Sequence, residues 1–249
     1  MSENWDFYVC DVEQERASIF VDLDLVEEAP MAHLPYLWTV RVTMLNPRPD
    51  GLSSSEEAAV LNELEDAWSA ELAKLVPPGV AAGRATYGGH RDQLAYVASA
   101  DGAEENVVAV REAFPGYDIQ SVIWEDPDWQ TYLGFLYPDE EQRLGIENWR
   151  VCAVLEEEGD PLTEPREIDH WIEFPDAEQR GQFEAKAVEL GFQTRCLIEP
   201  DEQSAWFGIQ IYNTDLPSHE KIDEITTPLF YLAREHGGNY DGWESVALQ

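Results

Sequence analysis

The residues with the strongest chemical character close the chain, in the stretch YDGWE at 240–244. Tyrosine and tryptophan supply much of the binding energy in protein interfaces, and carboxylates beside them favour a basic partner. Turn geometry accounts for Asp241 but does not require Tyr240, Trp243 or Glu244. We therefore predict that these four residues dock a partner protein. The alternative is that the two aromatic rings only fill the end of a domain core.

Three glycines frame this motif and are explained by backbone geometry alone. Gly237 and Gly238 follow a helical pattern, and glycine supplies the left-handed conformation in which helices end. Asp241-Gly242 has the composition of a turn, with a strand expected only from Trp243 onward. Gly237, Gly238 and Gly242 are therefore interpreted as structural.

Two groups of carboxylates have the composition of a magnesium site. These are Asp22-x-Asp24 and Glu125-Asp126-x-Asp128. Carboxylate oxygens are the ligands that Mg²⁺ prefers, but no histidine or asparagine joins either group. With 51 acidic residues among 249, such groups arise by chance. We expect no metal and no cofactor, and keep a metal-dependent hydrolase in the N-terminal domain as an alternative function.

Two other features resemble catalytic motifs and have simpler structural explanations. His170 lies beside Asp169, but neighbouring residues of a strand point to opposite faces, so the two cannot pair and His170 is expected to be buried. The stretch GGHRD at 88–92 resembles a phosphate loop, yet it joins two strands and opens no helix, which favours a hairpin turn. Nucleophile elbows, P-loops and dinucleotide fingerprints are missing from the sequence.

Charge dominates the composition, with 51 acidic against 15 basic residues and a net charge of −36 spread over both halves. Such a field repels nucleic acid and anionic membranes and attracts a basic protein. Lysine is scarce (Lys74, Lys186 and Lys221), so adaptation to a salty cytoplasm is an alternative cause. An acidic N-terminus and the lack of a long apolar run predict a cytoplasmic protein without membrane contact. The oligomeric state is left open.

The elements expected in the first half follow from hydrophobic periodicity. Alternating apolar and polar residues predict half-buried strands, and apolar residues three and four apart predict helices. The predicted strands lie at 16–25, 38–44, 80–87, 92–99 and 117–125, and the predicted helices at 53–75 and 103–114.

The second half repeats the same order after a helix and a linker. The predicted strands lie at 166–174, 192–199, 205–212 and 243–248, and the predicted helices at 139–159, 176–191 and 218–238. From residue 36 onward in the first half, and from residue 166 onward in the second, the order is strand, helix, strand, strand, helix, strand. This order closes as an antiparallel sheet with two helices on one face. The predicted fold is α+β, two ferredoxin-like sandwiches joined by a connecting helix, with domains at 1–137 and 161–249 and the helix and linker at 138–160.

Specific stretches also carry family resemblances. REIDHWIEF (166–174), ELGFQTR (189–195) and above all GGNYDGWE (237–244) resemble the regulator of ribonuclease E activity B family, the ribonuclease E inhibitor proteins, over residues 164–249. The first half resembles domain of unknown function 695 through WDFYVC, ASIFVDL, DGLSSSEE, GRATYGGHRDQLAYV and EDPDWQTYLGFLYP.

The resemblance of the first half to domain of unknown function 695 implies a fold and a fusion to the second domain, but no activity. The resemblance of residues 164–249 implies a non-catalytic regulator, not an enzyme, that binds ribonuclease E or its degradosome scaffold and slows RNA decay without touching RNA. An acidic domain would associate rapidly with an arginine-rich region of such a partner, or with another basic RNA-processing protein. A third possibility is a module that binds a small ligand or peptide in a cleft between the two sandwiches, lined by Trp5, Trp38, Trp124 and Trp129.

Overall fold

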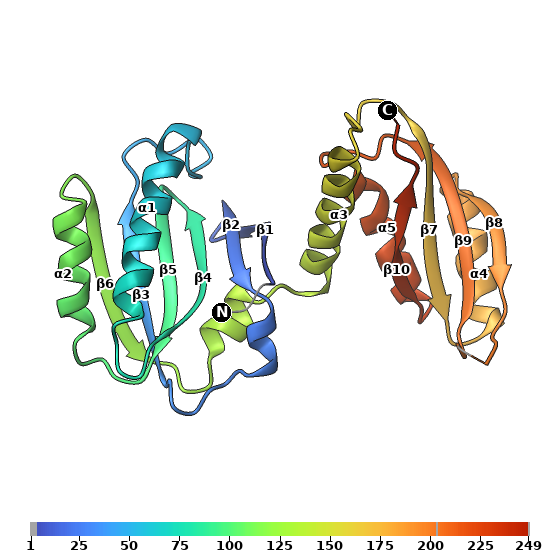
Figure 1. The fold of residues 1–249 in the computed structure, drawn as a ribbon. Helices are drawn as coiled ribbons and strands as arrows, with labels where there is room; N and C mark the ends of the chain where they lie inside the picture. Colours follow the sequence, from blue (N-terminus) through green and yellow to red (C-terminus); the bar gives the residue numbers. More distant parts are fainter. Residues whose placement is uncertain (1–3, 203, 249) are drawn as a thin grey trace. The chain divides into compact units, whose positions relative to one another are not determined.

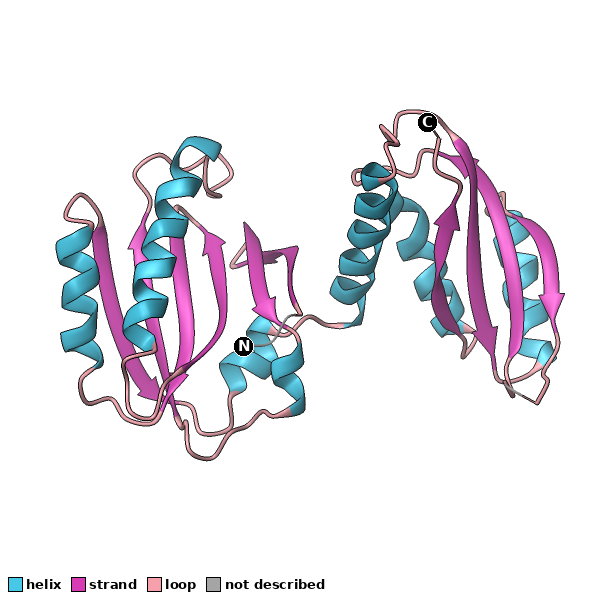
Figure 2. Cartoon of the chain, in the orientation of Figure 1, coloured by secondary structure: helices cyan, strands magenta, loops and turns pink. Residues whose placement is uncertain are grey.

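The strand expected at 38–44 forms as β3 (Tyr36–Thr43), an inner strand of the sheet in the first half of the chain. The computed structural model describes residues 4–202 and 204–248. The chain separates into a first unit, residues 1–142, and a second unit, residues 143–249. Each unit has its own antiparallel sheet (Figures 1 and 2).

The first unit follows the predicted order of strands and helices from residue 36 onward. Its elements are β1 (Trp5–Val12), β2 (Glu15–Asp22), η1 (Asp24–Glu27), β3, α1 (Ser55–Leu72), β4 (Val80–Tyr87), β5 (His90–Val97), α2 (Ala103–Ala113), β6 (Asp118–Glu125) and η2 (Tyr132–Leu136). The sheet runs β1-β2-β4-β5-β3-β6, so a hairpin, β1–β2, extends a ferredoxin-like arrangement at its β4 edge.

Helices α1 and α2 cover one face of this sheet (Figure 1). The period-two face of β3 and the helical stripe of α1 meet there, with the rings of Trp38 and Trp68 5.7 Å apart. The turn at 88–89 joins β4 to β5, and both of its glycines have positive φ, at +57° and +78°. The predicted hairpin at GGHRD is therefore confirmed.

The second unit has the ferredoxin-like order in full. Its elements are β7 (Arg166–Phe174), α4 (Ala177–Glu189), β8 (Gln193–Ile198), β9 (Phe207–Asp215), α5 (Ile222–Glu235) and β10 (Asn239–Ser245), preceded by α3 (Glu140–Glu157). The sheet runs β10-β7-β9-β8 with each neighbouring pair antiparallel. The predicted fold class is confirmed for both units.

The core of the second unit lies between this sheet and its helices. Alternation turns one face of β7 toward α4 and α5, and Cys152 and Leu155 of α3 add to the same cluster. Buried members from the two central strands are Ile168, Ile172, Phe174, Ile209 and Ile211. The opposite face of the sheet is left without a covering helix in the described part of the unit (Figure 1).

Helix α5 ends where the two glycines stand. Gly237 has φ +68°, and its N–H donates to the carbonyl of Arg234, while Gly238 N–H donates to Ala233. This paired pattern ends a helix with a left-handed residue. A Cβ on Gly238 would lie 2.3 Å from the ring of Phe174, so a side chain there would displace the ring.

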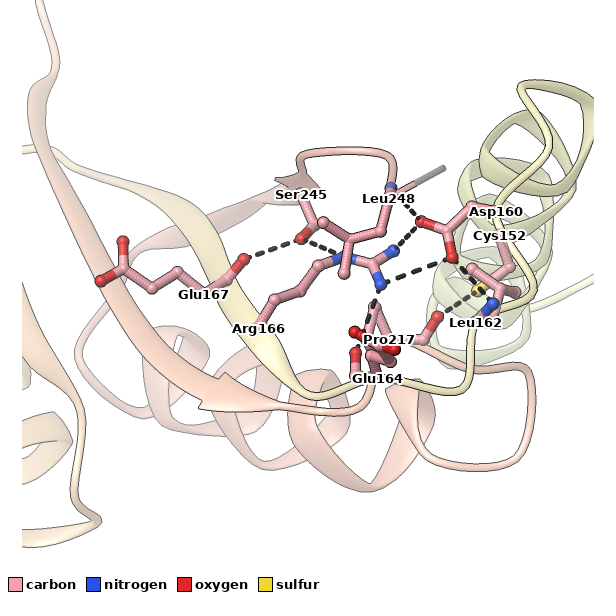
Figure 3. Close-up of polar contacts among 9 residues, drawn as sticks. All are labelled: Cys152, Asp160, Leu162, Glu164, Arg166, Glu167, Pro217, Ser245 and Leu248. Carbon is pink, nitrogen blue, oxygen red and sulfur yellow. Dashed lines mark hydrogen bonds and ion pairs between the residues drawn. The ribbon is translucent and has the colours of Figure 1, made fainter.

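The chain end is held by a buried ion pair (Figure 3). Asp160, 3% exposed, receives the guanidinium of Arg166 and the backbone N–H groups of Leu162 and Leu248. Burial alone would raise the pKa of Asp160, but these N–H groups and Arg166 outweigh it and hold the pKa below its usual value. Arg166 also donates to Ser245, the last residue of β10.

None of the helices in the described residues combines the length and the apolar character that a membrane span needs.

Candidate functional site

The predicted docking motif is itself a strand. We expected a turn at Asp241-Gly242 and a strand from Trp243, but β10 already begins at Asn239. Tyr240 pairs with Ile172 and Gly242 pairs with Trp171, so Asp241 is an extra residue without a partner, a β-bulge. Gly242 has φ +138°, a conformation that residues with a Cβ rarely adopt.

The bulge decides which way the aromatic rings point. Residues 240 and 243 would face opposite sides of a regular strand, because side chains alternate. The extra residue reverses the alternation, so Tyr240 and Trp243 both face the core and are 8% and 7% exposed. Their burial agrees with the alternative interpretation, in which the two rings fill the end of the domain core. Asp241 and Glu244 are exposed, so only these two of the four predicted docking residues can meet a partner without repacking.

Trp243 is further tied to the helices by hydrogen bonds. Its indole Nε1 donates to Oδ1 of Asn148 on α3 at 2.8 Å. The amide nitrogen of Asn148 donates in turn to Asp223 and Thr226 of the α5 segment, each at 2.7 Å. Trp243 therefore fastens β10 to α3 and, through Asn148, to α5.

The uncovered side of the second sheet carries the accessible charge. We call it the open face, and the strand register places these residues on it: Glu167, Asp169, Trp171, Glu173, Gln193, Arg195, Cys196, Ile198, Gly208, Gln210, Tyr212, Thr214 and Glu244. Its one cation, Arg195, donates to both Asp169 and Glu167. The guanidinium also lies over the ring of Tyr212, 4.1 Å from its centre. One arginine is thus held between two carboxylates and an aromatic ring.

A hollow of about 90 Å³ lies beside this arrangement, and we call it the Gly208 pocket. Gly208 pairs with Glu173 on one side and with Ile198 on the other, and its missing side chain leaves the space between them. The walls include the rings of Trp171 and Trp206 and the carboxylates of Glu173, Glu199, Asp201 and Asp241. Trp206 is 44% exposed.

Two of these carboxylates have no side-chain partner among the described residues. Glu199 is paired with Arg180, and Asp201 accepts the N–H of Ser204. Glu173 and Asp241 make no side-chain hydrogen bond or ion pair in the described part of the chain. None of the described residues that line the pocket is Lys, Arg or His. The pocket is therefore an aromatic and negatively charged hollow on an exposed sheet.

Comparison with protein families decides what the two units resemble. Residues 3–137, more than half of the chain, match the model described as Family of unknown function (DUF695). The chain belongs to the DUF695 family. Residues 145–245 match the family Regulator of ribonuclease activity B, so both resemblances noted from the sequence are confirmed. No curated protein matches the chain.

Two solved structures show weak likenesses to the chain. An unknown protein from Galdieria sulphuraria is 14% identical with a TM-score of 0.23. A putative glycine cleavage system transcriptional repressor is 11% identical with the same TM-score. Each alignment covers 85% of this chain and 98% of the other.

The DUF695 unit uses its carboxylate groups structurally. Asp126 accepts hydrogen bonds from the hydroxyl of Tyr96 and from the N–H groups of Gln130 and Thr131. These bonds hold the pKa of Asp126 below its usual value, although burial, the largest single influence, acts to raise it. Asp22 accepts the N–H of Asp24. In residues 4–202 and 204–248, no group of three or more possible metal ligands converges.

The tryptophans proposed to line a cleft have other roles in the DUF695 unit. Trp38 and Trp129 are fully buried within it, so neither ring can contact a ligand in a cleft. Trp129 stacks on Tyr96 at 3.8 Å, and Trp5 stacks on Phe20 at 5.1 Å. Trp124 is 41% exposed.

His170 is buried, as predicted, and its Nδ1 lies 2.8 Å from the hydroxyl of Tyr240. Asp169 lies on the open face with Arg195, so the two neighbours do not pair. Burial lowers the pKa of His170 to about 4, and the nearby side chain of Asn213, which favours the protonated ring, opposes the shift.

This pKa predicts a pH-dependent stability. The unfolded chain protonates His170 near pH 6.5, whereas the folded chain keeps it neutral down to about pH 4. The stability from His170 is therefore complete above pH 6.5 and falls by about 3 kcal/mol as the pH drops through this window. Denaturant unfolding of the wild type and of His170→Gln between pH 4 and 7 measures it. Equal slopes for the two proteins would contradict the prediction.

Sequence reasoning missed the open-face residues Trp171, Glu173 and Arg195. The sequence did contain a signal for Trp171 and Glu173, because the period-two pattern of β7 places them on the face opposite to that of Ile172. A glycine inside a strand, such as Gly208, also indicates a close approach or a gap. No sequence pattern could place Trp206, which belongs to a loop and reaches the pocket only through the fold.

Proposed function

We propose that the protein is a non-catalytic regulator that binds ribonuclease E, or its degradosome scaffold, and slows RNA decay in the bacterial cytoplasm. The observation that carries the proposal is the family match of residues 145–245, since that family consists of regulators of ribonuclease activity. The DUF695 unit is proposed to accompany this regulator without a role in catalysis.

The charge of the open face supports a basic protein partner. Five carboxylates, those of Glu167, Asp169, Glu173, Asp241 and Glu244, lie on or beside it against the single guanidinium of Arg195 among the described residues. A surface of this sign repels RNA, so inhibition must act through the enzyme and not through its substrate. Opposite charges on the two proteins would steer and accelerate their association.

The open face also meets the structural requirements of an interface. It belongs to a sheet whose other side is packed by helices, so its side chains are displayed on a rigid support. Asp241 and Glu244 of the closing motif reach this surface, while Tyr240 and Trp243 hold the strand that carries them. The motif contributes to binding in two ways, through its acids directly and through its aromatic residues as a scaffold.

The proposal is tested with the purified full chain and purified ribonuclease E. We expect a complex and a slower cleavage of an RNA substrate, with no cleavage by the regulator alone. The dissociation constant should rise at least tenfold as the salt is raised from ~0.1 to 1 M, because the Debye length falls from ~10 to 3 Å. Unchanged cleavage at a saturating concentration of the regulator, at low salt, would contradict the proposal.

A further inference from the structure

The open face already shows how it holds a guanidinium. Arg195, which is the extra residue in the β8 bulge, lies between the carboxylates of Glu167 and Asp169 and over the ring of Tyr212. Two carboxylates satisfy the N–H groups of the fork, and the ring contacts its planar surface. The arrangement lies entirely on the sheet surface.

The Gly208 pocket offers the same set of groups without the cation. Glu173 and Asp241 supply two carboxylates with no partner in the described residues, and Trp171 and Trp206 supply two aromatic rings. Neither indole nitrogen is hydrogen-bonded in the part of the chain that the structure describes. Arg180, whose guanidinium reaches the pocket residue Glu199, is committed to Glu199 and to the carbonyls of Ile198 and Gly208.

We propose that the Gly208 pocket takes the side chain of an arginine from a basic partner protein. This inference rests on the proposed function and names the residue type that the open face recognises. The carboxylates of Glu173 and Asp241 receive the guanidinium, and the indoles of Trp171 and Trp206 contact its planar faces.

The size of the pocket restricts the occupant to a side chain. Sites for small molecules and cofactors have volumes of roughly 300–1,000 Å³. The hollow at Gly208 measures about 90 Å³, which excludes a nucleotide but admits the end of one long side chain. Gly208 sets this size, because a Cβ there would lie 3.1 Å from the Cβ of Ile198.

The chemistry of the walls favours arginine over lysine. A guanidinium is planar, stacks on aromatic rings and donates to two carboxylates at once, whereas an ammonium is compact and more strongly hydrated. Tryptophan gives the strongest attraction of any ring to a cation on its face. An arginine-rich peptide should therefore bind more tightly than a lysine-rich peptide of equal charge.

The test measures binding of three synthetic peptides to the full chain by calorimetry: one of alternating glycine and arginine, its lysine counterpart and its uncharged citrulline counterpart. Glu173→Gln with Asp241→Asn removes two charges from the pocket. Glu220→Gln with Glu235→Gln is the matched control, because both acids are exposed and lie outside the open face. Trp206→Leu is a second variant, at an exposed ring whose loss leaves the core intact.

We expect the pocket pair and Trp206→Leu each to weaken binding of the arginine peptide about tenfold, and the control pair less than about twofold. The indole N–H resonances of Trp171 and Trp206 should shift on binding, while that of the buried Trp243 stays in place. Equal losses in the pocket pair and the control pair would overturn the inference, as would equal affinity for the arginine and lysine peptides.

The two proposals fail in distinguishable ways. If ribonuclease E binds the pocket variants as tightly as the wild type, the regulator function stands and the arginine pocket is wrong. If ribonuclease E does not bind the wild type but the arginine peptide does so through the pocket, the inference stands and the partner is a different basic protein.

Discussion

Replacing Asp160 by alanine is expected to lower the free energy of unfolding of the second unit by about 3–5 kcal/mol. The change leaves the guanidinium of Arg166 buried without its carboxylate, since the Arg166 side chain is only 8% exposed (Figure 3). It also removes the acceptor of the Leu162 and Leu248 N–H groups, so the linker and the chain end lose their common anchor. Urea unfolding at neutral pH measures the loss.

The matched control is an ion pair in the same unit that lies in water. Lys186 and Glu189 are paired at 2.8 Å with both side chains more than half exposed, so Glu189→Ala should hardly change the free energy of unfolding. An Asp160→Ala loss as small as that of the control would show that Arg166 finds another partner or reaches solvent.

Replacing Trp243 by alanine is expected to destabilise the second unit by a similar amount, about 3–5 kcal/mol. The indole is buried, and its removal leaves a cavity between β10 and α3 together with an unsatisfied amide oxygen on Asn148. Trp243→Phe should cost less, because the ring still fills most of the space while only the hydrogen bond is lost. Thermal unfolding of both variants measures the difference.

Trp206→Ala is the control for this prediction. Its ring is 44% exposed and belongs to a loop residue that lines the Gly208 pocket, so its loss should hardly change the unfolding free energy. A Trp243→Ala variant as stable as Trp206→Ala would contradict the assignment of Trp243 to the core.

These expectations change how the closing motif should be tested for binding. A variant that combines Trp243→Ala with Asp241→Ala would lose binding through unfolding as readily as through a lost contact. A substitution at Asp241 alone separates the two effects, because this residue is exposed and has no strand partner at the bulge. Its replacement by asparagine removes the charge and keeps the strand.

The aromatic pair in YDGWE shows why composition alone misassigned part of the site. Tyrosine and tryptophan are suited both to a buried core and to a docking surface, and composition does not distinguish the two. Acidic residues are less ambiguous, because a carboxylate without a partner stays near water. Asp241 and Glu244 were accordingly predicted at the surface and lie there.

Sequence pattern was enough to predict the order of strands and α-helices from residue 36 onward, the fold class of both units and the burial of His170. Hydrophobic periodicity carries this information, since periods of 2.0 and 3.6 fix which side chains share a face. The bulge at Asp241, the pocket at Gly208 and the contacts of Asp160 with Arg166 and Leu248 became visible only in the folded chain. Each depends on contacts between segments that are separated in the chain. A local sequence pattern does not indicate which strand, loop or chain end will lie beside a given segment.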